Sequence, residues 1–248
     1  MISIQLWSLR DAIADLGWGS VLDAVAAAGC RHVEPFGLAA TLPLIAESLA
    51  RNGLTTPTAH GDLTGDDLAP TLEAAAAAGV SVIVHPSFAA DRWQEKDGIQ
   101  QIAADLNRAA AAAEPLGMNV AFHNHDDDLA PGPDGRPGVV ALMDEVAPNV
   151  GVEFDPHWAT VAGADVLATL ASLGPRVLAV HLKDGPRRPS HADQAVLGEG
   201  DLDWPAFLVA IDPAVPRVIA ADRIDGDQLD AALRSLRWLE AHQTQSEN

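Results

Sequence analysis

Short apolar segments alternate eight times with longer segments of helical character, and this alternation constrains the fold more than any other feature. The segments that predict strands span residues 2–7, 32–36, 55–60, 81–85, 119–123, 150–155, 177–181 and 215–220. The segments that predict helices span residues 19–28, 42–51, 66–78, 99–116, 138–146, 165–173, 204–211 and 228–242. Strands that are separated by helices in this way pair in parallel. Eight such units in 248 residues predict a single (β/α)₈ barrel domain that covers residues 1–248.

Several other classes of protein are disfavoured by the sequence. No Gly-x-Gly-x-x-Gly motif or phosphate-binding loop follows the first predicted strand, which argues against nucleotide-binding folds. The net charge of −20 would repel nucleic acid. The single cysteine, Cys30, excludes an internal disulfide bond. Because we find no secretory signal and no segment of membrane-spanning length, we expect a cytoplasmic protein without a membrane partner, and a homo-oligomer remains open.

Polar side chains gather where the predicted strands end. The carboxyl ends of the strands of a barrel meet on one face, and the active site is built there. Six of the nine histidines fall at these ends, a concentration that favours a functional site over scattered structural histidines. In chain order the candidate residues of the strand ends are Glu34, His60, His85, His123, His125, Asp155, His157, His181 and Lys183.

Two of these residues, Asp155 and His181, predict a metal site. They end neighbouring strands, and parallel strands lie about 4.8 Å apart, so both side chains can reach one cation. His123 is the third predicted ligand, and such a set of imidazole and carboxylate groups suits zinc, manganese, iron, nickel or cobalt. Side chains alternate along a strand, so His125 shares a face with His123 and Lys183 shares a face with His181. Lys183 is interpreted either as a proton carrier or as the partner of a nearby carboxylate.

Two further features have both a functional and a structural interpretation. Glu199 lies between two glycines in the loop after the seventh strand, where it either reaches the barrel mouth or belongs to a tight turn. Three tryptophans, Trp7, Trp93 and Trp158, either form an apolar platform for a ligand or pack in the core.

Five segments of the chain carry a resemblance to a known family. They are residues 5–10, 122–126, 153–158, 181–184 and 197–204, which include Phe-His-Asn-His-Asp and His-Leu-Lys-Asp. On these motifs the sequence resembles the sugar phosphate isomerase/epimerase family of xylose-isomerase-like TIM barrels. The resemblance implies one divalent metal ion, with manganese, zinc, magnesium and cobalt all open as its identity.

The resemblance also implies which residues hold the metal, and it reveals one departure. Members of the family use Glu, Asp, His and Glu from strands 5 to 8, which correspond here to His123, Asp155, His181 and Ala220. Alanine binds no metal and moves no proton, whereas Asp222 of the same motif is retained. Three outcomes follow: His123, Asp155 and His181 hold the metal alone, Glu199 or Asp222 substitutes for the missing ligand, or the site has lost its metal.

The resulting hypothesis is a metal-dependent isomerase or epimerase that abstracts a proton next to the carbonyl of a small sugar, keto-sugar or polyol. One alternative is a lyase, a dehydratase or deglycosidase that eliminates from a keto-sugar, because Ala220 removes a base. A second alternative is a non-catalytic barrel that binds a sugar or a protein partner. The predicted catalytic residues are His123, His125, Lys183 and Glu199. The predicted substrate-binding residues are Trp7, Glu34, His60, His85, His157 and Asp222.

Overall fold

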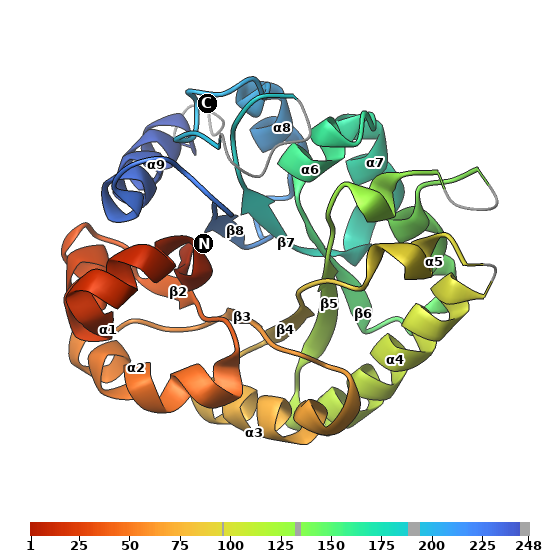
Figure 1. Cartoon of the computed structure of the whole chain (residues 1–248), viewed down its shortest axis with the longest axis horizontal. Coiled ribbons are helices and arrows are strands. Elements are labelled where there is room, and N and C mark those ends of the chain that lie inside the picture. The colour runs from red at the N-terminus through yellow and green to blue at the C-terminus, as the bar shows by residue number, and fades with distance from the viewer. Residues whose placement is uncertain (96, 132–134, 188–193, 244–248) are drawn as a thin grey trace.

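Eight parallel strands form a nearly closed barrel, as the alternation predicts (Figure 1). The structure is a computed structural model that describes residues 1–95, 97–131, 135–187 and 194–243. The strands are β1 (Ile2–Gln5), β2 (His32–Glu34), β3 (Thr58–His60), β4 (Val82–His85), β5 (Asn119–His123), β6 (Val150–Phe154), β7 (Val177–Leu182) and β8 (Arg217–Ile219). Their order in the sheet is β2-β1-β8-β7-β6-β5-β4-β3.

The two ends of this sheet, β2 and β3, meet through backbone hydrogen bonds. The amide of Val33 donates to the carbonyl of Thr55 at 2.9 Å, and the amide of Thr55 donates to the carbonyl of Arg31 at 3.1 Å. Closer to the strand ends, the amide of His60 donates to the carbonyl of Pro35 at 2.7 Å. This closure brings the carboxyl end of β3, with its histidine, beside the ends of the other strands.

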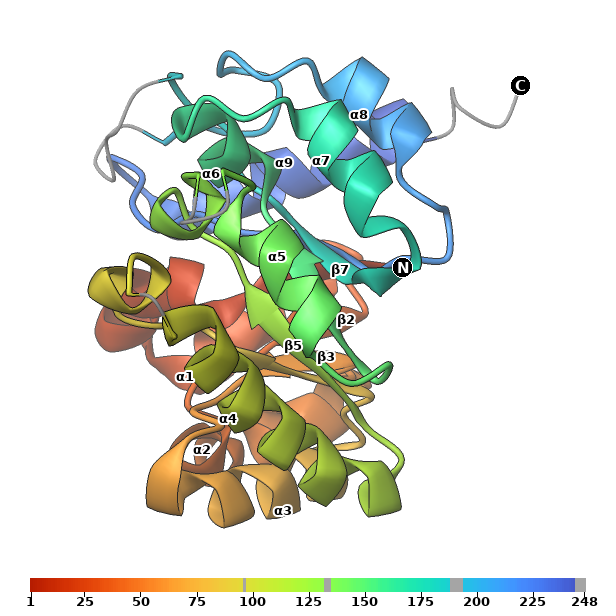
Figure 2. The same cartoon turned by 90° about the vertical axis from the view of Figure 1, so that its right-hand side faces the viewer.

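The helices surround the barrel as an outer ring (Figures 1 and 2). They are α1 (Arg10–Ala27), α2 (Leu38–Asn52), α3 (Leu68–Ala78), α4 (Gly98–Ala113), α5 (Gly138–Glu145), α6 (Pro156–Val161), α7 (Val166–Leu173), α8 (Trp204–Ala210) and α9 (Gln228–Gln243). Short 3₁₀ helices lie at Leu6–Leu9, Gly65–Asp67, Ala90–Trp93, Glu114–Leu116, Asp127–Leu129 and Gly174–Arg176. None of the helices in the described ranges has the length and hydrophobicity that a bilayer crossing requires.

Two helical segments were not expected from the sequence. The helix predicted to start at Gly19 begins at Arg10, with a break at Gly17, whose φ of 80° interrupts the helical periodicity. Helix α6 was missed altogether, although it has a clear start signal. The Asp155 side chain accepts hydrogen bonds from the amides of His157 and Trp158, and Pro156 occupies the first helical position.

The hydrophobic core has two parts. The larger part lies between the barrel and the helices, as is usual for this architecture. The smaller part fills the barrel interior with Val82, Val84 and Ala121, against which Leu178 packs. Because the lower interior is filled by apolar side chains, polar groups that point inward at the strand ends form the floor of a cavity rather than a pore.

Candidate metal and substrate site

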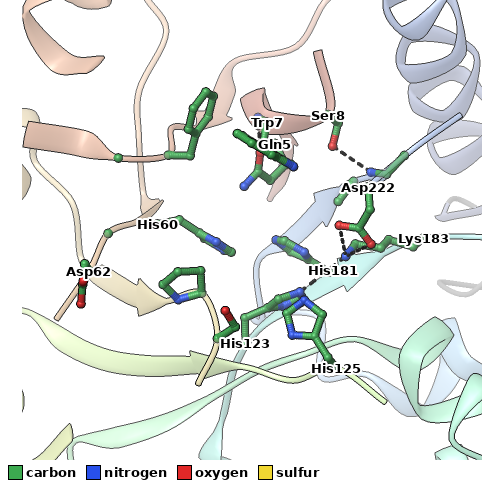
Figure 3. A pocket seen from close by; sticks show the side chains of 17 residues that line it. Gln5, Trp7, Ser8, His60, Asp62, His123, His125, His181, Lys183 and Asp222 are labelled. Atoms are coloured by element: carbon green, nitrogen blue, oxygen red, sulfur yellow. Dashed lines mark hydrogen bonds and ion pairs between the residues drawn. The ribbon is translucent and has the colours of Figure 1, made fainter. Parts of the chain in front are cut away.

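Four buried side chains from four strands meet at the carboxyl end of the barrel. His60, His123, Glu153 and His181 end or nearly end β3, β5, β6 and β7, and one potential ligand atom of each lies within 4.8 Å of the others. The register of the sheet places His123 directly beside Glu153. Figure 3 shows the three histidine side chains converging. We call these four residues the His/Glu cluster.

Glu153 is the centre of the His/Glu cluster. Its Oε2 atom lies 2.6 Å from Nε2 of His60, 3.0 Å from Nε2 of His181 and 3.4 Å from Nδ1 of His123. Glu34 approaches the same histidines from β2, with its Oε1 2.8 Å from Nε2 of His181 and 3.2 Å from Nε2 of His60. Two imidazoles are therefore held between two fully buried carboxylates.

Burial and charge act in opposite directions on these groups. Burial disfavours the charged imidazolium, but Glu34 and Glu153 outweigh it and raise the pKa of His60 to about 10 and that of His181 to about 9. Burial and repulsion by Glu34 oppose ionisation of Glu153, yet His181 and His60 lower its pKa to about 2. His123 differs, because burial and the positive charges of His181 and Lys183 hold its pKa well below the usual value.

The residues of the His/Glu cluster fit a divalent cation. Imidazole nitrogen and carboxylate oxygen are the donors that zinc, manganese and cobalt accept in proteins. Oε1 of Glu153 and Oε2 of Glu34 are buried and have no hydrogen-bond partner among the described residues. An unsatisfied buried carboxylate oxygen is costly, and a bound cation would remove that cost.

A cavity of about 340 Å³ opens above the His/Glu cluster (Figure 3). Its floor includes His60, His123 and His181, while Glu153 lies beneath the lining residues. Trp7 forms part of the wall with 45% of its surface exposed, and its ring packs edge-on against Phe36 at 5.0 Å. The remaining lining residues are Gln5, Ser8, Gly37, Gly61, Asp62, Pro86, Ser87, His125, Lys183, Ala220, Ala221 and Asp222.

Lys183 is held between two carboxylates on one side of this cavity. Its Nζ atom lies 3.0 Å from Oδ2 of Asp155 and donates to both carboxylate oxygens of Asp222 at 2.9 and 3.0 Å. Burial disfavours the charged amine, but the two aspartates raise the pKa of Lys183 to about 12. The alternative that the sequence left open, an ion-paired lysine, therefore matches this geometry, and a lysine with a lowered pKa does not.

The predicted metal ligand Asp155 lies beside the His/Glu cluster rather than in it. Its Oδ1 atom caps helix α6 by accepting from the amides of His157 at 3.0 Å and Trp158 at 3.1 Å. Its Oδ2 atom is 3.0 Å from Lys183 and 3.8 Å from Nε2 of His123. Glu153, which sequence analysis did not select, and His60, which it assigned to substrate, complete the cluster with His123 and His181.

The other predicted substrate and catalytic residues divide into two groups. Those that line the cavity are Trp7, His60, His123, His125, Lys183 and Asp222. Those that do not are Glu34, His85, His157 and Glu199. Glu34 contacts the cluster histidines from below, and His85 uses its Nδ1 to accept from the amide of Leu63 at 3.2 Å. His157 is fully buried within α6 because Asp155 starts a helix there.

Glu199 and its glycines serve a structural purpose. The Glu199 carboxylate pairs with Arg234 on α9 and is half exposed, away from the cavity. Its neighbours fold onto Asp184, whose Oδ2 accepts from the amide of Gly198 at 2.8 Å and from Nε1 of Trp204 at 2.9 Å. A Cβ atom on Gly200 would lie 2.0 Å from Oδ1 of Asp184. The motif thus closes a tight loop, and the prediction of a catalytic Glu199 is not supported.

The three tryptophans selected from the sequence differ in whether they face the cavity or are buried. Trp7 faces the cavity, whereas Trp93 and Trp158 are buried. Trp93 packs against Phe122 with ring centroids 5.2 Å apart. Lys183 lies 5.7 Å from the ring centroid of Trp158. Of the three, Trp7 is therefore placed for contact with a ligand.

A parallel barrel with a buried His/Glu cluster under a strand-end cavity defines the class of protein, and the sequence comparison identifies the family. The profile of the xylose isomerase-like TIM barrel family matches residues 22–242, so the chain belongs to that family. The resemblance found from the motifs is thereby confirmed. None of the curated proteins matches the chain.

Solved structures show the same fold at low sequence identity. A sugar phosphate isomerase/epimerase from Parabacteroides distasonis is 18% identical, with 97% of this chain and 93% of that chain covered and a TM-score of 0.78. A probable 3-DHS dehydratase from Bacillus anthracis is 14% identical over 96% and 98% of the two chains, with a TM-score of 0.79. The protein IOLI, whose structure holds a zinc atom, is 15% identical over 99% and 98%, with a TM-score of 0.75.

Proposed function

We propose that the protein is a metal-dependent isomerase or epimerase that moves a proton next to the carbonyl group of a small sugar, keto-sugar or polyol. The observation that carries this proposal is the His/Glu cluster at the floor of a cavity that also exposes His125 and Asp222. Its volume of about 340 Å³ suits a small ligand. The family and its structural neighbours include an isomerase/epimerase and a dehydratase, which supports an enzyme of this general kind.

The His/Glu cluster is the proposed metal site. A divalent cation held by His60, His123, Glu153 and His181 would polarise a substrate carbonyl and acidify the adjacent C–H group. Glu34 contacts the same Nε2 atoms of His60 and His181 as Glu153 does, so it would place a second carboxylate beside the cation. In this assignment His123 is a ligand, so it is not free to move the substrate proton.

His125 is the proposed proton acceptor. It lines the cavity, which is what supports this assignment. Burial together with the charge of Lys183 lowers its pKa to about 3, so the imidazole is neutral at pH 7 but only weakly basic. Lys183 stays charged between Asp155 and Asp222 and orients both carboxylates instead of acting as a base. Asp222 is the proposed acceptor for substrate hydroxyl groups, and Trp7 the surface for an apolar sugar face.

A second reaction, elimination, is favoured by Ala220. This residue lines the cavity at the position where the sequence motif suggests a glutamate. Inverting a carbon centre by proton transfer on both faces needs two bases, whereas isomerisation on one face or elimination of a β-hydroxyl group needs one. His125 with Ala220 therefore suits isomerisation or elimination better than epimerisation, and a dehydratase acting on a keto-sugar is the second candidate.

Metal content tests the proposed ligand set. We expect Glu153→Gln to lose bound metal because it removes the central carboxylate of the His/Glu cluster. Asp155→Asn should retain metal, since this carboxylate is engaged by α6 and Lys183. Metal analysis of the three purified proteins decides between them. Loss of metal from Asp155→Asn alone would restore the ligand set predicted from the sequence.

Proton exchange tests the reaction. Metal-loaded protein is incubated in deuterated water with a panel of keto-sugars, and NMR follows loss of the proton next to the carbonyl and any loss of water. His125→Asn should slow exchange by about 10²-fold or more, the usual contribution of a general base. His242→Asn, on α9 outside the cavity, is the matched control and should keep the wild-type rate. If no sugar exchanges its proton with the wild-type protein, the proposed activity is refuted.

A further inference from the structure

The charges that face the cavity carry an inference about its ligand. Lys183 is the ammonium group among the described lining residues, and its Nζ atom contacts three acceptors: Asp155, Asp222 and Nε2 of His123, the last at 3.5 Å. An ammonium group has three N–H donors. The geometry therefore leaves Lys183 without a donor for an anionic ligand.

Two carboxylates face the cavity directly. The Asp222 side chain is 26% exposed and that of Asp62 is 51% exposed, and both residues line the cavity wall. Asp222 is fixed in place, because its Oδ2 also accepts from Nε2 of Gln194 at 3.1 Å. The positively charged imidazoles of His60 and His181 at the cavity floor are already paired with Glu34 and Glu153. At the wall formed by Asp222 and Asp62, a phosphate or carboxylate group would meet like charges in a partly enclosed site, where repulsion is screened less than at an open surface.

Arg10, which contacts two residues of the cavity wall, uses its donors on their backbone carbonyls. The guanidinium group of Arg10 donates to the carbonyl of Trp7 at 3.0 Å and to the carbonyl of Asp222 at 2.7 Å, and it lies over the Trp7 ring. It is not a lining residue of the cavity. The other polar groups of the wall include the uncharged side chains of Gln5, Ser8 and Ser87, which suit hydroxyl groups.

We propose that Asp222 is a specificity-determining residue. It holds Lys183 in an ion pair and adds its own negative charge to the cavity wall, so that the cavity selects uncharged polyhydroxylated carbonyl compounds over their phosphate esters. The substrate part of this inference rests on the proposed function. The charge part does not, because it concerns only which small molecules the cavity binds.

Inorganic phosphate is the probe for the charge part. Denaturation midpoints are measured in phosphate and in chloride at equal pH and ionic strength. Wild-type protein should show no phosphate-specific stabilisation, whereas Asp222→Asn should bind phosphate at least about tenfold more tightly, because Lys183 regains a free donor. The double variant D222N/K183Q should lose this gain. Asp62→Asn is the matched control, a cavity carboxylate without contact to Lys183, and should gain less.

Two results would overturn the charge part. One is phosphate binding by the wild-type protein as tight as by Asp222→Asn. The other is a gain that persists in D222N/K183Q, since the anion would then bind without Lys183.

A second measurement needs no variant and therefore remains decisive if Asp222→Asn fails to fold. Wild-type affinity is compared for an uncharged sugar alcohol and for its phosphate monoester, and the uncharged ligand should bind at least about tenfold more tightly. Equal or tighter binding of the monoester refutes the inference but leaves the proton-exchange test of the proposed function standing. Proton exchange that fails while the uncharged ligand still binds refutes the function alone.

Discussion

Asn124 stands between His123 and His125, and its side chain is predicted to be essential for the geometry of the site. The residue is fully buried, and its amide group bridges the ends of two strands. Oδ1 of Asn124 accepts from the backbone amide of Asp155 at 2.8 Å, and Nδ2 donates to the backbone carbonyl of Asp155 at 3.2 Å. One side chain thus pairs with both backbone groups of the residue that follows β6, where the regular ladder has ended.

The cost of removing this bridge can be worked out from its two bonds. Asn124→Ala leaves the buried N–H of Asp155 without a partner, at about 1–3 kcal/mol, whereas the C=O of Asp155 still accepts from the amide of Ala159 at 3.1 Å. Asn124→Asp keeps the acceptor but replaces the donor with a charged oxygen beside a carbonyl. Leaving an uncompensated charge in the interior costs about 3–5 kcal/mol. Either loss is a large fraction of the about 5–15 kcal/mol that stabilises a typical domain.

Urea denaturation measures the free energy of unfolding of each variant, and metal titration measures the site. Asn107→Ala is the matched control, because Asn107 makes the same kind of bridge, to the amide of Ala147 at 2.6 Å and the carbonyl of Glu145 at 3.2 Å. Water can reach that bridge, so its loss should cost about 1 kcal/mol and leave metal affinity unchanged. A cost for Asn124→Ala no greater than for Asn107→Ala would refute the reasoning.

Two other predictions concern the supports of the site. Gly200→Ala should destabilise the protein by about 1–3 kcal/mol in urea denaturation, because its Cβ would lie 2.0 Å from Oδ1 of Asp184, whereas Gly19→Ala meets no atom within 3.4 Å and should not destabilise. Asp128→Asn should stabilise the protein increasingly as pH rises above about 4, because burial, aided by Asp126 and Asp127, raises the pKa of Asp128. The folded state binds that proton more tightly than the unfolded state, so the free energy of unfolding of the wild-type protein falls as the pH rises through the raised pKa of Asp128. If the free energies of unfolding of the wild-type protein and of Asp128→Asn changed in parallel with pH, the prediction would be contradicted.

The eight strands could be predicted because each is buried on both faces and reads as a short apolar run between helices. The site face could be predicted because barrel topology alone brings strand ends together, wherever they lie in the sequence. The ligand set needed more than topology. Glu153 and Asp155 point to the same side by the alternation of side chains along a strand, so this alternation cannot decide which of the two carboxylates is the metal ligand. Register cannot be read from sequence either, and between β6 and β7 it shifts at Val152 and Glu153.

Helix α6 and the assignment of Asp155 were missed for one shared reason. Asp155 followed by Pro156 is a helix start signal. One carboxylate oxygen of an aspartate that caps a helix accepts hydrogen bonds from backbone amides. The other oxygen of Asp155 lies 3.0 Å from Lys183, so this carboxylate sits beside the His/Glu cluster rather than within it. The longer side chain of Glu153, one inward-facing position below, then reaches His60 and His181 instead. When an acidic residue at a strand end precedes proline, its duty as a helix cap therefore has to be weighed before it is counted as a metal ligand.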